Sequence, residues 1–325
     1  MSQVFPDNPL PTVDFSLVVS VYNEAQVLPI FWEEVSRQLV AIGCSCEVIF
    51  VNDGSTDGSL GVLQKILADS SRVRIVSLSR NFGHEAAMLA GIDSSRGQAV
   101  ICLDADLQHP PSYIPRLLEE HRNGNLIVHM VRTETVGATW YGNVRSRLFY
   151  RLINVLSPEG FVPNASDFFL IDRRVCDLLR KDFRERTRFL RGIIQVVGFP
   201  KKTIPFTAPL RAAGKSKYNF FRLCNASIGA LATFSRLPLR FGLFLGIGCG
   251  AFSVIVGVYS VVMKMLGNVI TGYTTIVVLL SFVFAVQLVL LGIIGEYIGF
   301  IFEEVKRRPI YIVESLDEGK VYEPS

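Results

Sequence analysis

Two long uncharged segments near the C-terminus restrict what this chain can fold into. Residues 241–263 carry no charge, and after Lys264 the chain is uncharged again over 265–295. A bilayer core needs about 20 apolar residues per helix, so each segment is long enough to cross it. A buried helical hairpin in a soluble core is the alternative, but apolar segments of this length rarely occur there. We therefore predict two transmembrane helices, near 239–263 and 273–300.

Basic residues beside these spans predict their orientation. Arg236 and Arg240 precede the first span and 306–308 is a basic triplet after the second, whereas the connecting loop carries only Lys264. Because Lys and Arg are enriched on the cytoplasmic side, both flanks are expected there. Residues 1–12 lack the apolar region of a signal peptide, and the six cysteines form neither CxxC pairs nor a disulfide framework. The segment before the spans is thus predicted to be cytoplasmic, with reduced thiols.

The rest of the chain alternates between two kinds of apolar pattern. Short apolar runs of strand type lie at 15–21, 47–51, 74–78, 99–103 and 126–130, and helical patterns lie between them around 25–41, 58–69, 84–95 and 112–122. Strands that alternate with helices favour parallel pairing in an α/β sheet covered on both faces. In such sheets ligands bind at the carboxyl ends of the strands, so the residues that follow each strand are the ones to examine.

Polar clusters follow the first four predicted strands, at 22–24, 52–57, 79–83 and 104–106. Taken alone, Asn-Asp-Gly-Ser at 52–55 is ordinary turn chemistry, and Ser55 or Thr56 could cap the next helix. Four polar clusters at successive strand ends, however, converge on one crevice. The sequence therefore predicts a binding site there.

Asp104 and Asp106 are two residues apart, so in extended backbone their side chains point the same way. Two carboxylates so close repel each other unless a cation lies beside them. A hard divalent ion such as Mg²⁺ or Mn²⁺ suits oxygen ligands and bridges to a diphosphate, which indicates a nucleotide leaving group. The alternative is a solvated acidic turn closed by two prolines at 110–111. His109 we interpret as a surface or packing residue and leave out of the metal site.

Four stretches carry a family resemblance: Val-Tyr-Asn-Glu at 21–24, Asn-Asp-Gly-Ser at 52–55, Leu-Asp-Ala-Asp-Leu-Gln at 103–108 and Arg-Phe-Leu-Arg-Gly at 188–192. They resemble family 2 glycosyltransferases of the GT-A fold. More narrowly, the chain resembles polyisoprenyl-phosphate glycosyltransferases, which include dolichyl-phosphate mannose synthases and the bactoprenol glucosyltransferases with two C-terminal membrane helices. The resemblance implies an α/β fold: a Rossmann-like GT-A nucleotide-sugar-binding domain followed by a two-helix transmembrane hairpin. The expected divisions are a catalytic domain (1–215), interfacial helices (216–237), the membrane helices (238–303) and a cytoplasmic tail (304–325).

The resemblance also implies site roles. The sugar donor would be held by Tyr22, Glu24, Asp53, Arg80 and Asp104, and the metal by Asp104, Asp106 and Gln108. Asp106, Asp167 and Arg211 are the expected catalytic residues. The acceptor phosphate would be bound by Arg132, Arg145, Ser216 and Lys217. For basic residues near the membrane, contact with anionic lipid head groups is the alternative.

The implied reaction needs little base catalysis. A lipid monophosphate has a second pKa near 6, as a phosphorylated side chain does, so its attacking oxygen is mostly anionic at pH 7. Asp167 is therefore expected to orient the acceptor rather than deprotonate it, in a single displacement that inverts the anomeric centre. The polyprenyl tail stays in the bilayer. The segment 218–236 has helical apolar spacing and would lie at the interface or pack as an ordinary amphipathic helix on the catalytic domain.

Several identities follow from the resemblance as expectations. UDP-glucose is the first expected donor, ahead of GDP-mannose and other UDP-sugars, and undecaprenyl phosphate in a bacterial inner membrane is the expected acceptor. A homotetramer with an exchanged strand at 311–313 is a further expectation, and no nucleic-acid partner is expected. Alternatives are a processive or protein-directed glycosyltransferase and an inactive nucleotide-sugar-binding scaffold. Processive synthases carry a Q-x-x-R-W motif, but here Gln195 is followed by Val-Val-Gly, which disfavours polymer synthesis.

Overall fold

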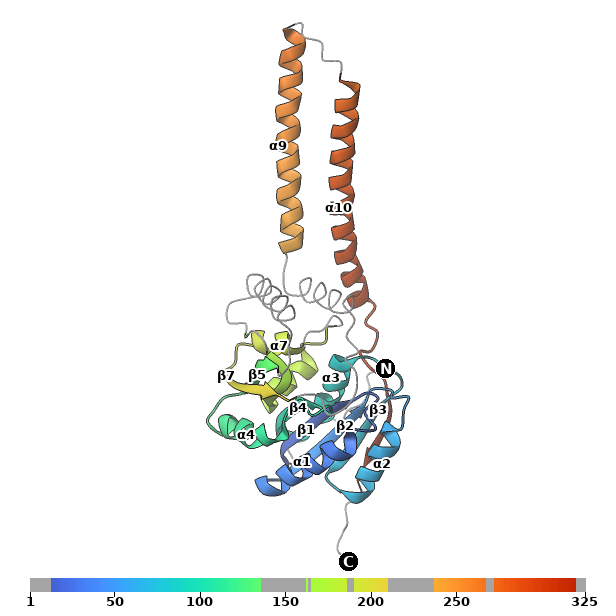
Figure 1. The fold of residues 1–325 in the computed structure, drawn as a ribbon, viewed down its shortest axis with the longest axis vertical. Coiled ribbons are helices and arrows are strands. Elements are labelled where there is room, and N and C mark those ends of the chain that lie inside the picture. Colours follow the sequence, from blue (N-terminus) through green and yellow to red (C-terminus); the bar gives the residue numbers. More distant parts are fainter. Residues whose placement is uncertain are drawn as a thin grey trace, which may run out of the picture. The chain divides into compact units, whose positions relative to one another are not determined.

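The computed structural model describes residues 13–135, 162, 165–185, 190–209, 237–266 and 272–319. The chain forms two compact units (Figure 1). One comprises residues 1–220 together with 308–325, and the other comprises 221–307. In the part of the chain that the structure describes, the first unit contains strands and helices and the second contains two long helices.

The first unit contains one sheet and the helices that cover it. Its strands are β1 (Val13–Val21), β2 (Cys46–Asn52), β3 (Val73–Leu78), β4 (Gly97–Asp104), β5 (Ile127–Thr135), β6 (Ala165–Asp172), β7 (Lys201–Ala208) and β8 (Val313–Glu318). Its helices are α1 (Leu28–Ile42), α2 (Ser59–Asp69), α3 (His84–Ser94), the 3-10 turn η1 (Pro111–Tyr113), α4 (Ile114–Arg122), α6 (Arg173–Lys181) and α7 (Leu190–Val196). The five predicted strands and four predicted helices are all present, with ends that differ by a few residues.

The strand order is β7-β5-β6-β4-β1-β2-β3-β8. Strands β4, β1, β2 and β3 are parallel neighbours, as predicted, and their residues are almost all buried because helices cover both faces. Two strands outside the five predicted ones run antiparallel to their neighbours: β6 to both β4 and β5, and β8 to β3. The parallel strands thus place their carboxyl ends, and the loops that follow, at one edge of a mixed sheet.

The end of the chain is part of this sheet. Within the predicted cytoplasmic tail, 304–325, strand β8 pairs with β3 of the same chain, from Arg74 opposite Glu318 to Leu78 opposite Val313. Tyr311, just before β8, is buried and donates its hydroxyl hydrogen bond to Asp93 of α3. The proposed strand exchange at 311–313 therefore concerns a segment that leads into an intrachain strand.

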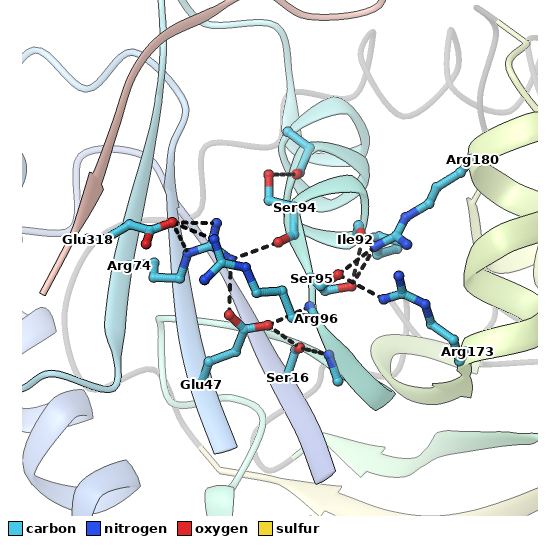
Figure 2. A network of polar contacts seen from close by, with 12 residues as sticks. Ser16, Glu47, Arg74, Ile92, Ser94, Ser95, Arg96, Arg173, Arg180 and Glu318 are labelled. Carbon is cyan, nitrogen blue, oxygen red and sulfur yellow. Dashed lines mark hydrogen bonds and ion pairs between the residues drawn. The ribbon is translucent and has the colours of Figure 1, made fainter. Parts of the chain in front are cut away.

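A network of polar and charged side chains joins β2 and β3, near their amino ends, to the carboxyl end of β8 (Figure 2). Arg74 of β3 pairs with Glu47 of β2 at 2.9 Å and with Glu318 of β8 at 3.1 Å. Glu47 also accepts hydrogen bonds from Ser16 Oγ and from the backbone N–H of Arg96, both at 2.6 Å. The network lies at the end of the sheet opposite the loops that follow the parallel strands, and it fastens the C-terminal strand to the sheet.

Among its described residues, the second unit contains α9 (Leu237–Met265) and α10 (Tyr273–Val305). Both helices contain segments long and apolar enough to cross a membrane, Phe244–Met263 and Phe282–Val305, each with a mean hydropathy of 2.0 and no part buried inside the protein. The two helices contact each other at Gly242, where an added Cβ would lie 2.9 Å from Leu290 Cδ2. Both predicted spans are thus helical, whereas the predicted interfacial segment 218–236 lies outside the described residues.

Candidate active site

The loops after β1 and β2 are tied together by side-chain to backbone hydrogen bonds. Asn23, in left-handed backbone with φ of +57°, donates its N–H to Ser55 Oγ at 3.0 Å. Its own Oδ1 accepts from the N–H of Thr56 at 2.8 Å. Asn52 Oδ1 accepts from the N–H of Ser55, so the predicted turn chemistry is confirmed. The alternative that Ser55 or Thr56 caps the next helix is wrong, because α2 begins after Gly58.

Asp53 connects the loop after β2 to the loop after β3. Only 3% of this residue is exposed, and its two carboxylate oxygens accept hydrogen bonds from the N–H groups of Phe82 at 2.7 Å and Gly83 at 3.0 Å. Burial raises the pKa of Asp53, although these two N–H groups favour the carboxylate. The predicted nucleoside ligand therefore holds the start of α3 in place.

The turn after β4 presents the paired aspartates. Leu107 takes up left-handed backbone with φ of +61°, which is uncommon for a residue with a branched side chain and is typical of functional loops. Asp106, 8% exposed, accepts from the N–H of Gln108 at 3.0 Å. Gln108 Oε1 in turn lies 3.5 Å from a guanidinium nitrogen of Arg132. Two predicted metal ligands and one predicted phosphate ligand thus lie together.

His109 is a packing residue, the second of the two alternatives that the sequence left open, and not a surface residue. It is 3% exposed and stacks on Phe168, with 5.4 Å between the ring centroids. Its Nδ1 accepts a hydrogen bond from the backbone N–H of Asp104 at 3.1 Å, so that nitrogen carries no proton. Burial lowers the pKa of His109, in agreement with a neutral ring.

His84, the first residue of α3, stands between two predicted site carboxylates. Its Nδ1 lies 3.0 Å from Ser20 Oγ and 3.5 Å from Asp104 Oδ1, and its Nε2 lies 3.5 Å from Asp167 Oδ2. Burial by itself would lower the pKa of His84, but Asp104 and Asp167 outweigh it and raise the pKa to about 10. The two carboxylates that face the ring therefore favour its protonated form.

Asp167, on β6, lies between two cations. Arg191 of α7 approaches its Oδ1 at 2.9 Å, on the side away from His84. Burial favours the neutral acid, but Arg191 and then His84 outweigh it and hold the pKa of Asp167 well below its usual range. Nearby Glu85 accepts from the N–H of Leu190 at 2.8 Å, and burial together with Asp167 raises its pKa to about 6.

The site offers oxygen and nitrogen ligands to a divalent cation. His84, Asp104 and Asp167 each offer one ligand atom, and these three atoms lie within 4.8 Å of one another. Only Asp104 belongs both to this group and to the predicted set of Asp104, Asp106 and Gln108. Carboxylate and amide oxygens at the carboxyl edge of the sheet suit Mg²⁺ or Mn²⁺, so the residues present fit such an ion.

The remaining predicted residues fall into two groups. Tyr22, 37% exposed, and Glu24 follow β1, and Arg80 follows β3 with its guanidinium 4.3 Å from the centre of the Phe82 ring. These three therefore lie at the same edge of the sheet as the aspartates. The other four lie outside the described residues: Arg145, Arg211, Ser216 and Lys217.

Sequence reasoning missed His84, Glu85, Ser20 and Arg191 as site residues. His84 and Glu85 open the helix that follows the third strand, directly after a polar cluster that was identified. Arg191 lies inside the Arg-Phe-Leu-Arg-Gly stretch that carried the family resemblance. The sequence therefore offered two signals, a position after a strand end and membership of a motif. Neither signal shows that these side chains meet Asp167.

Comparisons with known proteins identify the family of this chain. Residues 16–179 match the family model described as glycosyl transferase family 2. An uncharacterised glycosyltransferase of Synechocystis sp. is 37% identical over 94% of this chain and 96% of its own length. The SfII prophage-derived bactoprenol glucosyl transferase of Shigella flexneri is 34% identical over 94% of this chain and 98% of its own. A solved structure of glucosyl-3-phosphoglycerate synthase from Mycobacterium tuberculosis aligns with a TM-score of 0.47 at 21% identity, over 68% of this chain and 78% of that one.

The chain belongs to glycosyltransferase family 2. Its mixed α/β sheet has the GT-A type of architecture, and the predicted enzyme class is confirmed.

Proposed function

We propose that this glycosyltransferase transfers glucose from UDP-glucose to a polyprenyl phosphate, with undecaprenyl phosphate of a bacterial inner membrane as the acceptor. One observation carries the proposal: the carboxylate cluster at the sheet edge and a hairpin of two membrane-length helices occur in one chain. Relatives named bactoprenol glucosyl transferase match that chain over more than nine-tenths of its length. Such an arrangement suits a soluble donor and an acceptor that stays in the bilayer.

The donor would be bound by the loops that follow the parallel strands. Tyr22, Glu24, Asp53 and Arg80 would hold the nucleoside, and Asp104, Asp106 and Gln108 would hold Mg²⁺ or Mn²⁺. When bound, such an ion neutralises charge that develops on the leaving diphosphate. Arg132, which reaches Gln108, supplies a further positive charge beside the diphosphate or the acceptor phosphate.

The transfer is a single displacement. An oxygen of the acceptor phosphate forms a bond to the anomeric carbon, the bond from that carbon to the donor diphosphate breaks, and its electron pair leaves on the nucleoside diphosphate. No proton has to be removed, because the acceptor phosphate is already mostly anionic at neutral pH. Arg191 and His84 hold the pKa of Asp167 below its usual range, which makes it a weaker base and supports an orienting role. Backside attack inverts the anomeric centre.

Removing the acceptor lipid from the membrane would cost free energy, so the enzyme has to act at the membrane surface. Each methylene withdrawn from the membrane costs about 0.8 kcal/mol, so a long polyprenyl tail stays in the bilayer. The predicted orientation would place the catalytic unit on the cytoplasmic side, where nucleotide sugars are soluble. The predicted phosphate ligands Arg145, Arg211, Ser216 and Lys217 would complete the acceptor site.

The proposal is tested by transfer of radiolabelled glucose from UDP-glucose to undecaprenyl phosphate in detergent. We expect label in the organic phase with Mg²⁺ or Mn²⁺, and its loss with EDTA or in Asp106→Ala. Asp69→Ala, at an exposed site at the end of α2, is the matched control and should behave as wild type. Label only from GDP-mannose or another UDP-sugar would correct the donor. Label in protein or polymer, or none from any donor despite nucleotide binding, would reject the proposal.

A further inference from the structure

His84 joins three elements of the active site. It begins α3, while Asp104 ends β4 and Asp167 lies on β6, so the three residues come from separate parts of the chain. The ring nitrogens face different carboxylates, Nδ1 at 3.5 Å from Asp104 and Nε2 at 3.5 Å from Asp167. The side chains of all three are about one-sixth to one-third exposed, so the group lines the site rather than the core.

The Asp104 side of this link passes through Ser20. Ser20 Oγ lies 3.0 Å from His84 Nδ1 and donates to Asp104 Oδ1 at 3.2 Å. Because the serine hydroxyl gives its only proton to Asp104, it accepts from Nδ1–H of the imidazole. The chain of contacts therefore runs from His84 through the hydroxyl of β1 to the first predicted metal ligand.

Hydrogen bonds to the preceding backbone fix the position of His84. Asp53 accepts the N–H groups of Phe82 and Gly83, the two residues that precede His84. On the far side, Asp167 is held by Arg191, whose guanidinium also donates to the carbonyl of Ala165 at 3.2 Å. His84 thus connects two groups that are each anchored elsewhere, and a shift of its ring would change their separation.

We propose that His84 is a positioning residue that sets the distance between Asp104, on the donor side, and Asp167, on the acceptor side. The inference rests on the proposed function, in which Asp104 helps to hold the donor diphosphate and Asp167 orients the acceptor phosphate. Both substrates still bind without His84, but the attacking oxygen and the anomeric carbon are no longer held in line. Misplacement by about 1 Å costs on the order of 100-fold in rate, so kcat should fall while KM stays.

Three substitutions test the link in the full-length enzyme in detergent. His84→Ala removes both contacts and should lower kcat about 10- to 100-fold, with KM for donor and acceptor within about 3-fold of wild type. His84→Asn places an amide nitrogen near the position of Nδ1, and His84→Gln places one near that of Nε2. At least one of the two should recover much of the lost kcat, which a merely structural role would not predict.

A second readout does not depend on turnover. Calorimetric binding of UDP with Mn²⁺ should be within about 3-fold of wild type in His84→Ala, because positioning is lost but the predicted donor ligands remain. His121→Ala, which removes a histidine–carboxylate contact to Asp172 at 2.9 Å outside the site, is the matched control and should keep wild-type kcat.

A double substitution separates positioning from independent effects. If His84 acts through Asp167, His84→Ala combined with Asp167→Asn should be little slower than Asp167→Asn alone, because coupled residues give non-additive losses. Additive losses, or wild-type kcat in His84→Ala, would overturn the inference. A tenfold or greater loss of Mn²⁺-dependent UDP binding would also overturn it and make His84 a metal ligand. If wild-type enzyme transfers no sugar to lipid, the proposed function fails first and the inference falls with it.

Discussion

Gly54 is the residue at which one added carbon would separate two active-site loops. Its φ is +62°, and a Cβ there would lie 2.4 Å from the carbonyl carbon of Arg80 and 2.6 Å from the nitrogen of Asn81. These are backbone atoms, which cannot swing aside as a side chain does. We predict that Gly54→Ala lowers the free energy of unfolding by about 1–3 kcal/mol and weakens UDP binding. The reason is that the displaced loop, which contains Arg80 and Asn81, leads into the helix that carries His84.

Urea unfolding followed by tryptophan fluorescence would measure this change, since Trp32 packs edge-on against Phe50 with 6.1 Å between ring centroids. Gly61 supplies the control, because it lies in α2 with nothing within 4 Å of an added Cβ. Gly61→Ala should raise stability by about 0.5–1 kcal/mol. Equal effects at Gly54 and Gly61 would contradict the argument from close approach.

Asp172 gives the catalytic unit an acid-sensitive contact. It accepts from His121 Nε2 and from the N–H of Arg174 at the start of α6. Burial favours its neutral form, but these hydrogen bonds outweigh burial and lower the pKa from 3.8 to about 2. A carboxyl with a depressed folded pKa stabilises the fold fully above its unfolded pKa and loses that contribution as pH falls through the folded value.

The contribution of Asp172 should be about 2 kcal/mol at neutral pH, with about half of it lost by pH 3. Urea unfolding of wild type and Asp172→Asn from pH 6 to pH 3 would measure it. The difference between their free energies of unfolding should become smaller as the pH falls. A difference in free energy of unfolding that stays the same at every pH would show that the ionised carboxylate of Asp172 does not stabilise the fold.

At the scale of elements, Arg74 joins the amino ends of β2 and β3 to the carboxyl end of the antiparallel strand β8 (Figure 2). Its partner Glu47 is 6% exposed and accepts three hydrogen bonds, whereas the side chain of its partner Glu318 is 42% exposed. Removing one member of a buried pair leaves an uncompensated charge and costs about 3–5 kcal/mol, but an exposed pair contributes at most about 1 kcal/mol.

We therefore predict that Glu47→Gln destabilises the catalytic unit far more than Glu318→Gln, although both contact the same guanidinium. Urea midpoints of the two full-length variants in detergent, compared with wild type, would measure the difference. Comparable losses would show instead that the closure of β8 on the sheet, rather than the buried charge, dominates this region.

The elements differ in how well the sequence predicts them. Continuous apolar runs predicted β1 to β4 because a strand buried on both faces is apolar throughout. The same rule misses β8, Val-Glu-Ser-Leu-Asp-Glu, because an edge strand alternates polar and apolar residues and its charges resemble a solvated tail. Strand β6 was not predicted either, and nothing local in Ala165–Asp172 states which strand it pairs with or in which direction.

The site shows the same division between local and distant information. Asp104 and Asp106 were predicted because their spacing and their place after a strand are local features. The contacts of His84 with Asp167, 83 residues later, and of Arg191 with Asp167 arise from the order of strands in the sheet. Composition and periodicity do not encode that order, so residues that act through tertiary contacts were left out.

At the scale of the whole molecule, the sheet restricts how the hairpin crosses a membrane. β3 precedes α9 and β8 follows α10, yet the two strands are hydrogen-bonded neighbours in one sheet. If the hairpin crosses a membrane, this pairing requires both of its flanks to lie on the same side, so a single crossing is excluded. This strand pairing and the basic residues at the flanks are independent arguments for the same topology.

We predict that the connection between α9 and α10 lies on the outer face of the membrane and the C-terminus on the cytoplasmic face. A short epitope inserted between residues 268 and 269 should bind antibody in intact spheroplasts, because it would follow the two-crossing path. An epitope at the C-terminus should bind only after permeabilisation, and retained glucosyl transfer would show that each tagged chain is folded. If both epitopes were inaccessible in intact spheroplasts, the hairpin would not cross the membrane. If the C-terminal epitope alone were accessible, the orientation inferred from the basic flanks would be reversed.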